Sequence, residues 1–125
     1  MDLDQFRDFN RVLGRRAGDR LFHSVVQAVV DRLPTPSLLA RYGGDELAVL
    51  LPGAESAGAG ALAAELRQAI RSIPCALRPI TASLGVATDR PPDARTEDLI
   101  GAAARAMATA SAAGGDRVVG AVRTT

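Results

Sequence analysis

Cysteine, tryptophan, lysine and aromatic side chains are scarce or absent in this chain of 125 residues. The single cysteine, Cys75, cannot form an internal disulfide, so a reducing cytoplasm is the expected location. An aromatic content of 3% is too low for a base-stacking surface, and a net charge of +1 argues against a strongly basic one. We therefore expect no nucleic-acid partner. All 15 basic residues are arginine, a bias typical of GC-rich bacterial genomes.

Long apolar runs are also missing from the sequence. No run approaches the roughly 18 residues that a membrane-spanning helix needs, and the first residues lack the basic-then-apolar layout of a signal peptide. A content of 47% hydrophobic and 23% charged residues is typical of a soluble globular protein. The length predicts one domain over residues 1–125, which can bury about two-thirds of its unfolded surface.

The spacing of apolar residues predicts a mixed α/β order of helix, helix, strand, strand, helix, strand, helix, strand. Period 3.6 predicts helices at about residues 5–13, 19–33, 56–72 and 96–113. The second helix is expected to begin at Gly18-Asp19, with Asp19 as its N-cap. Short apolar or alternating runs predict strands at 38–42, 47–51, 80–86 and 117–122. This order predicts an α+β sandwich in which helices pack on a sheet.

Two acidic clusters interrupt this pattern. Asp2 and Asp4 lie at the start of the chain, and Asp45 and Glu46 lie in a predicted hairpin turn after Gly43-Gly44. Hard divalent ions such as Mg²⁺ bind carboxylate oxygens, often together with substrate phosphates. Adjacent glycines let a ligand approach the backbone closely. Taken alone, a Gly-Gly-Asp turn is more often only a turn, and Asp4 is more often structural or solvated than a ligand.

The wider pattern resembles the GGDEF family of diguanylate cyclases over the whole chain. The matching segments occur in the family's order and are Asp2-Leu3-Asp4-x-Phe6-Arg7-x-x-Asn10, Gly14, Gly18-Asp19, Arg41-Tyr42-Gly43-Gly44-Asp45-Glu46-Leu47 and Thr81-Ala82-Ser83-Leu84-Gly85-Val86-Ala87. In the signature itself, Leu47 stands in place of phenylalanine and keeps an apolar anchor. The resemblance implies a palm-like nucleotide-cyclase fold, with a central, mainly antiparallel sheet flanked by helices.

The resemblance also implies an activity, the condensation of two GTP molecules into cyclic di-GMP by two opposed domains. It implies that Asp2 and Asp45, with the Leu3 carbonyl, bind Mg²⁺ or Mn²⁺. Glu46 would help to activate the ribose 3′-OH.

The glycines of the turn, Gly43 and Gly44, would let the phosphates rest against it. Asn10 and Asp19 would bind the guanine edge, although Asp19 as a helix cap and Asn10 as a helix-end residue are the plainer alternatives. We expect Arg41 to support the turn through a carboxylate pair rather than to touch the substrate.

The chain departs from the family pattern in three places. The phosphate-gripping lysine and arginine of the family's last helix correspond here to Ser111 and Gly115, and Arg105 is a candidate for partial compensation. The product-inhibition arginine and aspartate correspond to Pro34 and Ser37, so we expect no feedback through that site. The family's first strand is largely missing ahead of Asp2.

Three hypotheses therefore remain from the sequence. The first is a diguanylate cyclase that pairs transiently with a second GGDEF domain, with sensory or dimerising modules outside this chain. The second is a degenerate GGDEF domain that binds a guanine nucleotide or a protein partner and regulates without turnover. The third is a purely structural domain. The loss of the family's two phosphate-binding cations, at Ser111 and Gly115, favours the second hypothesis. The retained acidic turn at Gly43-Gly44-Asp45-Glu46 favours the first.

Overall fold

The computed structural model of the chain describes residues 1–90, 92 and 95–121. The elements are β1 (Asp2–Leu3), α1 (Phe6–Leu13), α2 (Arg15–Val30), β2 (Leu38–Arg41), β3 (Leu47–Leu50), α3 (Ser56–Arg71), β4 (Ala82–Val86), α4 (Thr96–Ala112) and β5 (Arg117–Gly120). The element order expected from the sequence is confirmed. The structure adds the short strand β1 ahead of the first helix.

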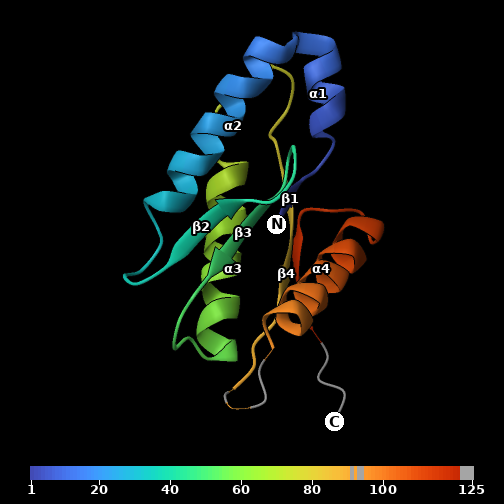
Figure 1. Ribbon diagram of the computed structural model, residues 1–125. Helices are drawn as coiled ribbons and strands as arrows, with labels where there is room; N and C mark the ends of the chain where they lie inside the picture. Colours follow the sequence, from blue (N-terminus) through green and yellow to red (C-terminus); the bar gives the residue numbers. More distant parts are fainter. Residues whose placement is uncertain (91, 93–94, 122–125) are drawn as a thin grey trace.

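The strands form a three-stranded sheet and a hairpin. The sheet has the order β1-β4-β5, in which β4 runs antiparallel to β1 and parallel to β5, and the hairpin pairs β2 with β3. A single bridge between Asp2 and Glu46 links the two. On either side of that bridge, the Leu3 amide donates to the Asp45 carbonyl and the Leu47 amide donates to the Met1 carbonyl. The hairpin therefore continues the sheet beyond β1 (Figure 1).

The helices cover the two faces of this sheet. Helix α3 lies on one side of β4 and α4 on the other, while α2 packs on α3 and α1 packs on α2 (Figure 1). Along β4, Gly85 faces α4 so closely that a side chain there would overlap the backbone of Ala103 and Met107. The neighbouring Leu84 points the other way, into the main core.

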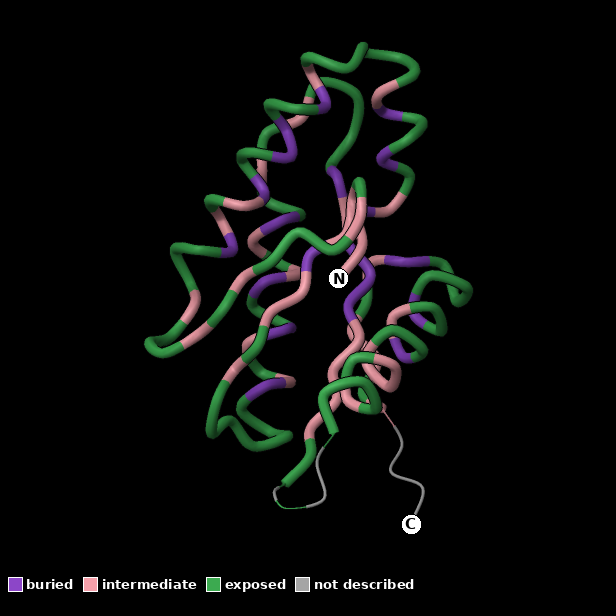
Figure 2. The backbone as a smooth tube through the Cα atoms, in the orientation of Figure 1, coloured by how far each residue is buried: buried purple, intermediate pink, exposed green. Residues whose placement is uncertain are grey.

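The main core lies between the sheet and helices α1, α2 and α3, and Figure 2 shows the buried residues gathered on their inner faces. All three phenylalanines belong to it. The rings of Phe6 and Phe9 stack at a centroid distance of 6.4 Å, and Phe22 lies 6.1 Å from Phe6. Aromatic side chains contribute large buried areas, and these three join α1 firmly to α2.

The start of the second helix was predicted wrongly. Helix α2 begins at Arg15, and Gly14, with a φ of 88°, is both the C-cap of α1 and the N-cap of α2. Glycine reaches this φ without strain, so the chain turns from one helix into the next at a single residue. Asp19 consequently lies within α2, is exposed, and caps nothing.

Other boundaries differ by a few residues. The helix predicted to reach residue 33 ends at Val30, and the strand predicted from residue 80 begins at Ala82. The last strand ends at Gly120; Val122, which the prediction included, lies outside the described residues.

Candidate active site

The acidic turn connects two paired strands. Strand β2 ends at Arg41, β3 begins at Leu47, and the five residues between them form a bend rather than a two-residue hairpin turn. The amide of Tyr42 donates to the Glu46 carbonyl at 2.9 Å and closes the bend. Leu47 is 4% exposed and packs in the main core, so leucine does anchor the turn as expected.

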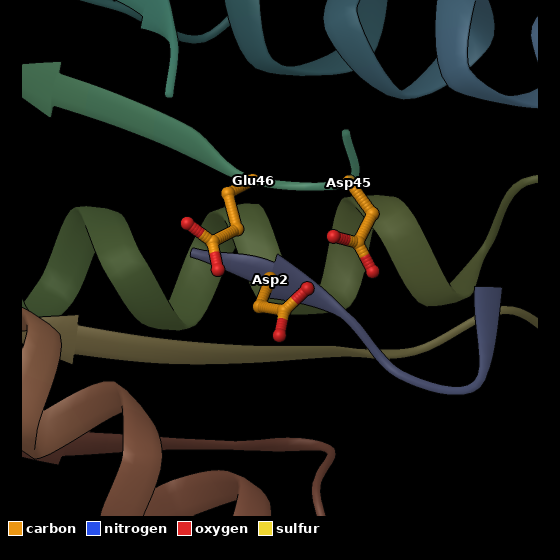
Figure 3. Close-up of side chains that lie close together, drawn as sticks. All are labelled: Asp2, Asp45 and Glu46. Atoms are coloured by element: carbon orange, nitrogen blue, oxygen red, sulfur yellow. The ribbon is translucent and has the colours of Figure 1, made fainter. Parts of the chain in front are cut away.

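Backbone pairing brings Asp2 to this turn. Because Asp2 is bridged to Glu46, its carboxylate lies beside those of Asp45 and Glu46, and Figure 3 shows the three side chains converging. Each residue offers one carboxylate oxygen, and these three oxygens lie within 4.8 Å of one another. The structure thus brings together residues from the beginning of the chain and from the hairpin.

The electrostatics of the cluster are unfavourable without a cation. Burial, reinforced by the carboxylates of Asp45 and Glu46, raises the pKa of Asp2 from 3.8 to about 7, although the Met1 amino group opposes the shift. One oxygen of Asp2, Oδ1, is buried and has no hydrogen-bond partner. Carboxylates that repel one another in a partly buried place are typical of sites that bind cations or share a proton.

This donor set fits Mg²⁺ or Mn²⁺. Both are hard ions that prefer carboxylate oxygens and complete their coordination with water or phosphate oxygens. The orphaned Asp2 Oδ1 and the three converging oxygens match that preference. Leu3 directly follows Asp2 in β1 and is 3% exposed, so only its backbone can take part in such a site.

The two glycines of the turn differ in the space beside them. Neither Gly43 nor Gly44 has a positive φ, so the backbone conformation alone does not require glycine there. Nothing lies within 4 Å of the place where a Gly44 side chain would begin, whereas Glu46 folds back over Gly43. The Cα of Gly44 is therefore bordered by open space.

Arg41 supports the turn, but its partners differ from those predicted. Its guanidinium donates to the carbonyls of Gly43 at 3.3 Å and Gly44 at 2.5 Å, not to a carboxylate. The same group lies over the ring of Phe22, 4.1 Å from the centroid. A planar group with several donors can make both contacts at once. Arg41 therefore ties the turn to the aromatic part of the core.

The two residues assigned to guanine lie apart from the carboxylates, on α1 and α2. Asn10 is half-buried, and its Oδ1 is buried without a hydrogen-bond partner. The carboxamide packs against Gly18, while Asp19 is exposed at the next position. The structure thus places both residues at one contact between the two helices.

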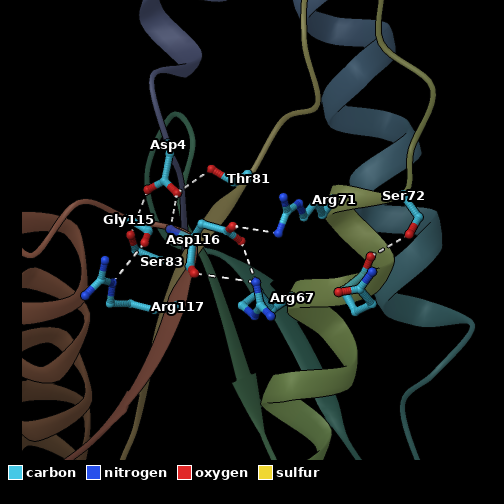
Figure 4. A network of polar contacts seen from close by, with 10 residues as sticks. Asp4, Arg67, Arg71, Ser72, Thr81, Ser83, Gly115, Asp116 and Arg117 are labelled. Carbon is cyan, nitrogen blue, oxygen red and sulfur yellow. Dashed lines mark hydrogen bonds and ion pairs between the residues drawn. The ribbon is translucent and has the colours of Figure 1, made fainter.

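A polar network beside the carboxylates was missed by the sequence reasoning. The Asp4 carboxylate accepts hydrogen bonds from the hydroxyls of Thr81 and Ser83 and from the Asp116 amide, at 2.7, 2.7 and 2.8 Å (Figure 4). Asp116 in turn forms ion pairs with Arg67 at 2.7 Å and with a second arginine of α3, Arg71, at 3.2 Å.

Asp4 is therefore structural, as expected, and it joins β1, β4 and the loop before β5. The two-residue spacing of Asp2 and Asp4 hinted at a shared role. Its partners, however, come from distant parts of the chain that local patterns do not connect.

That loop contains Gly115, the position expected from the sequence to correspond to the family's phosphate-gripping arginine. Gly114, Gly115 and Asp116 all have positive φ, of 118°, 75° and 50°. Gly115 is buried, and a Cβ there would lie 2.6–2.8 Å from the carboxylate atoms of Asp4. Ser111 and Arg105 are exposed on α4. In this conformation position 115 has no room for a side chain.

Comparison with known proteins agrees with this architecture. The family described as "Diguanylate cyclase, GGDEF domain" matches residues 1–117. The chain is 37% identical over 123 residues to an uncharacterized protein of Mycobacterium tuberculosis, covering 94% of this chain and 20% of that protein. It is 31% identical over 122 residues to the diguanylate cyclase DgcP of Pseudomonas aeruginosa, covering 94% and 18%.

Solved structures show the same fold. The diguanylate cyclase SiaD of Pseudomonas aeruginosa, crystallised with its activator SiaC, is 28% identical and superposes with a TM-score of 0.87 over 96% of this chain and 47% of that one. The chain therefore belongs to the GGDEF domain family of diguanylate cyclases.

The chain spans about a fifth of the length of the curated relatives that it matches. Among the residues that the structure describes, no helix is both long enough and apolar enough to cross a membrane.

Proposed function

We propose that residues 1–125 form a single cytoplasmic GGDEF domain that condenses two GTP molecules into cyclic di-GMP. The observation that carries this proposal is the convergence of the Asp2, Asp45 and Glu46 carboxylates within 4.8 Å, at a turn with open space beside the Cα of Gly44. Such a cluster suits the metal-assisted attack of a hydroxyl on a phosphate.

In this proposal, Asp2, Asp45 and the Leu3 carbonyl would bind Mg²⁺ or Mn²⁺. The ion would neutralise charge on the triphosphate. Glu46 would accept the proton of the 3′-OH of a GTP held by the opposing domain. That oxygen would form a bond to the α-phosphorus, and pyrophosphate would leave.

Substrate binding in the proposal relies on the turn and on the helix contact. The phosphates would rest against Gly43 and Gly44, and Asn10 with Asp19 would bind guanine. Two GTP-loaded domains must face each other, so the partner would be a second GGDEF domain in a transient homodimer. Modules outside this chain would control that pairing.

A second function is favoured by one specific observation. The loop before β5 is tied down by Asp4 and holds Gly115 against it, while Ser111 offers no cation. Two missing charge-assisted contacts, each worth about 1.5–3 kcal/mol, would weaken GTP binding by about two orders of magnitude or more. A domain that binds a guanine nucleotide or a protein partner without turnover is therefore the alternative.

One experiment separates these functions. The protein is incubated with GTP and Mg²⁺, product is analysed by chromatography, and GTP binding is measured independently by calorimetry. Cyclic di-GMP from the wild type, but not from Asp45→Ala or Glu46→Ala, supports the cyclase. GTP binding without product supports the regulatory domain, and the absence of both supports a structural one.

A further inference from the structure

We propose that Gly18 determines the guanine selectivity of this domain by fixing the orientation of the Asn10 carboxamide; the inference rests on the proposed function. Gly18 is buried, and it is the fourth residue of α2. A Cβ at this position would overlap Asn10 Oδ1 and would lie 2.6 Å from Asn10 Cγ. The carboxamide therefore fills the space that any other residue at position 18 would need.

This contact is costly for the fold by itself. Asn10 Oδ1 is buried and accepts no hydrogen bond, and a buried carbonyl oxygen without a partner is unfavourable. Glycine inside a helix is also less favourable than alanine. The unpaired Asn10 oxygen and the helical Gly18, each unfavourable for stability, therefore lie in contact. Features that lower stability in this way are concentrated at functional sites, where they are retained for function.

The contact fixes which group of Asn10 faces away from α2. Oδ1 lies against Gly18, and Nδ2 is the more distant amide atom, 3.3 Å from the Cβ position. Asn10 consequently presents a hydrogen-bond donor, and the exposed carboxylate of Asp19 at the next position of α2 is an acceptor.

A donor beside an acceptor complements the guanine base. Guanine has acceptor atoms that suit Nδ2, and its N1–H and 2-amino groups donate to a carboxylate. Adenine lacks both of these donors, so the same pair rejects it. Rotation of the Asn10 amide would remove the hydrogen bond from Nδ2 to guanine while leaving the Asp19 and triphosphate contacts intact. GTP would then lose affinity, whereas ATP, whose base does not use this pair, would not, so the preference for GTP would fall.

Substitution by alanine is a selective test of this orientation. The three atoms nearest to the added Cβ all belong to the side chain of Asn10, which is only half-buried and can rotate outward. Gly60 in α3 is a matched control, because it is also a helical glycine and nothing lies within 4 Å of its Cβ position. Gly18→Ala and Gly60→Ala gain the same helix propensity, but only the first displaces Asn10.

The experiment measures GTP and ATP binding to the wild type and to these variants by calorimetry, with Ca²⁺ in place of Mg²⁺ to suppress turnover. Gly18→Ala is expected to lower GTP affinity about tenfold or more, to leave any ATP binding unchanged and to melt no lower than the wild type. Gly60→Ala is expected to bind both nucleotides as the wild type does. In an Asn10→Ala background, Gly18→Ala is expected to have no further effect on GTP affinity.

Four results would overturn the inference. Unchanged GTP selectivity in Gly18→Ala would overturn it while leaving the proposed function in place. A further loss of affinity in the Asn10→Ala background, or a melting temperature of Gly18→Ala well below that of Gly60→Ala, would show that Gly18 does not act through Asn10. A wild type that binds no GTP would overturn both the inference and the proposed function.

Discussion

Asp2 holds its proton more tightly in the folded protein than in the unfolded chain. Burial and the neighbouring carboxylates raise its pKa from 3.8 to about 7, so the unfolded chain releases this proton at lower pH. The stabilisation that Asp2 contributes is therefore complete below about pH 4. It is lost as the pH rises through about 7.

This pKa predicts opposite pH dependences without and with a divalent cation. In EDTA, the melting temperature of the wild type relative to that of Asp2→Asn should fall as the pH rises from 4 to 7, because asparagine mimics the protonated acid and does not titrate. With Mg²⁺ present, stabilisation by the ion should grow over the same range, since the ion displaces the proton. If the difference in melting temperature between the wild type and Asp2→Asn were the same at every pH, with and without Mg²⁺, the raised pKa of Asp2 and the cation site would both be contradicted.

Arg41 acts on the turn from outside the carboxylate cluster. Lysine has a single ammonium group that cannot donate to the Gly43 and Gly44 carbonyls while lying flat over Phe22. We expect Arg41→Lys to lower the free energy of unfolding by only about 1 kcal/mol, but to reduce the rise in melting temperature that Mg²⁺ produces.

The matched control for this prediction is Arg32→Lys, because Arg32 lies just beyond the end of α2 and its guanidinium donates to the Ala28 carbonyl of that helix, far from the turn in sequence. Equal stabilisation by Mg²⁺ in Arg41→Lys and Arg32→Lys would mean that the turn does not depend on Arg41 for its shape.

The sequence predicted the roles of some residues correctly but not the contacts of others. Leu47 was expected to anchor the turn because it keeps the apolar character of the family signature, and the structure agrees. Asp4 was expected to be structural or solvated rather than a ligand, and its hydrogen bonds make it structural. The partners of Arg41 could not be predicted, because carbonyls and aromatic rings compete with carboxylates for a guanidinium. The Asn10–Gly18 contact depends on how closely two helices approach, which a one-dimensional pattern does not contain.

A substitution in the loop between α4 and β5 tests whether the family's phosphate-binding arginine can be restored in this chain. Gly115→Arg must adopt a φ of about 75° and place its Cβ 2.6–2.8 Å from the Asp4 carboxylate. We expect this variant to lose more than about 1 kcal/mol of stability and to gain no GTP affinity. Melting curves and calorimetry with GTP check the two expectations.

Ser111→Lys provides the contrast at the same end of the helix. Ser111 is exposed in the last turn of α4, where a cation is favourable. This variant should remain within about 0.5 kcal/mol of the wild-type stability and should bind GTP roughly tenfold more tightly. A stable Gly115→Arg protein with increased GTP affinity would show that the loop rearranges more easily than the Asp4 network implies.

The helices and strands were predicted better than their ends. Periodicity located every helix, because each has one buried stripe. The start of α2 was misplaced because Gly14 turns the chain in one residue, whereas Asp19 carried the stronger local capping signal. The parallel pairing of β4 with β5 follows from the crossover through α4, a long-range relation that strand patterns alone do not determine.

In the molecule as a whole, β1 connects the carboxylate cluster to the three-stranded sheet, to the β2-β3 hairpin and to the hydrogen-bond network of Asp4. It pairs with β4, it is bridged to Glu46, and it leads directly into the Asp4 network. The convergence of Asp2 with Asp45 and Glu46 was expected only from the family resemblance. Spacing along the chain gave no reason to bring residues so far apart together. The pairing of β1 with both the sheet and the hairpin supplies that reason.

The proposed reaction also requires more than one such molecule. A cyclic dinucleotide contains two new phosphodiester bonds, and each bond needs a 3′-OH from the GTP of the opposing domain. Isolated domains meet only by mass action, whereas a flexible linker gives a local concentration in the millimolar range. We therefore expect specific activity to rise with protein concentration.

A tandem fusion of two copies should further exceed the separate domain at low micromolar concentration, by about tenfold or more. The control is a fusion with Asp45→Ala in one half. It retains one intact carboxylate cluster, so only one of the two bonds can form within the fusion. At low micromolar concentration it should release no more cyclic product than the separate domain does. Equal activity per domain in the single copy, the tandem and the half-substituted tandem would mean that each domain works alone, and two-domain condensation would have to be abandoned.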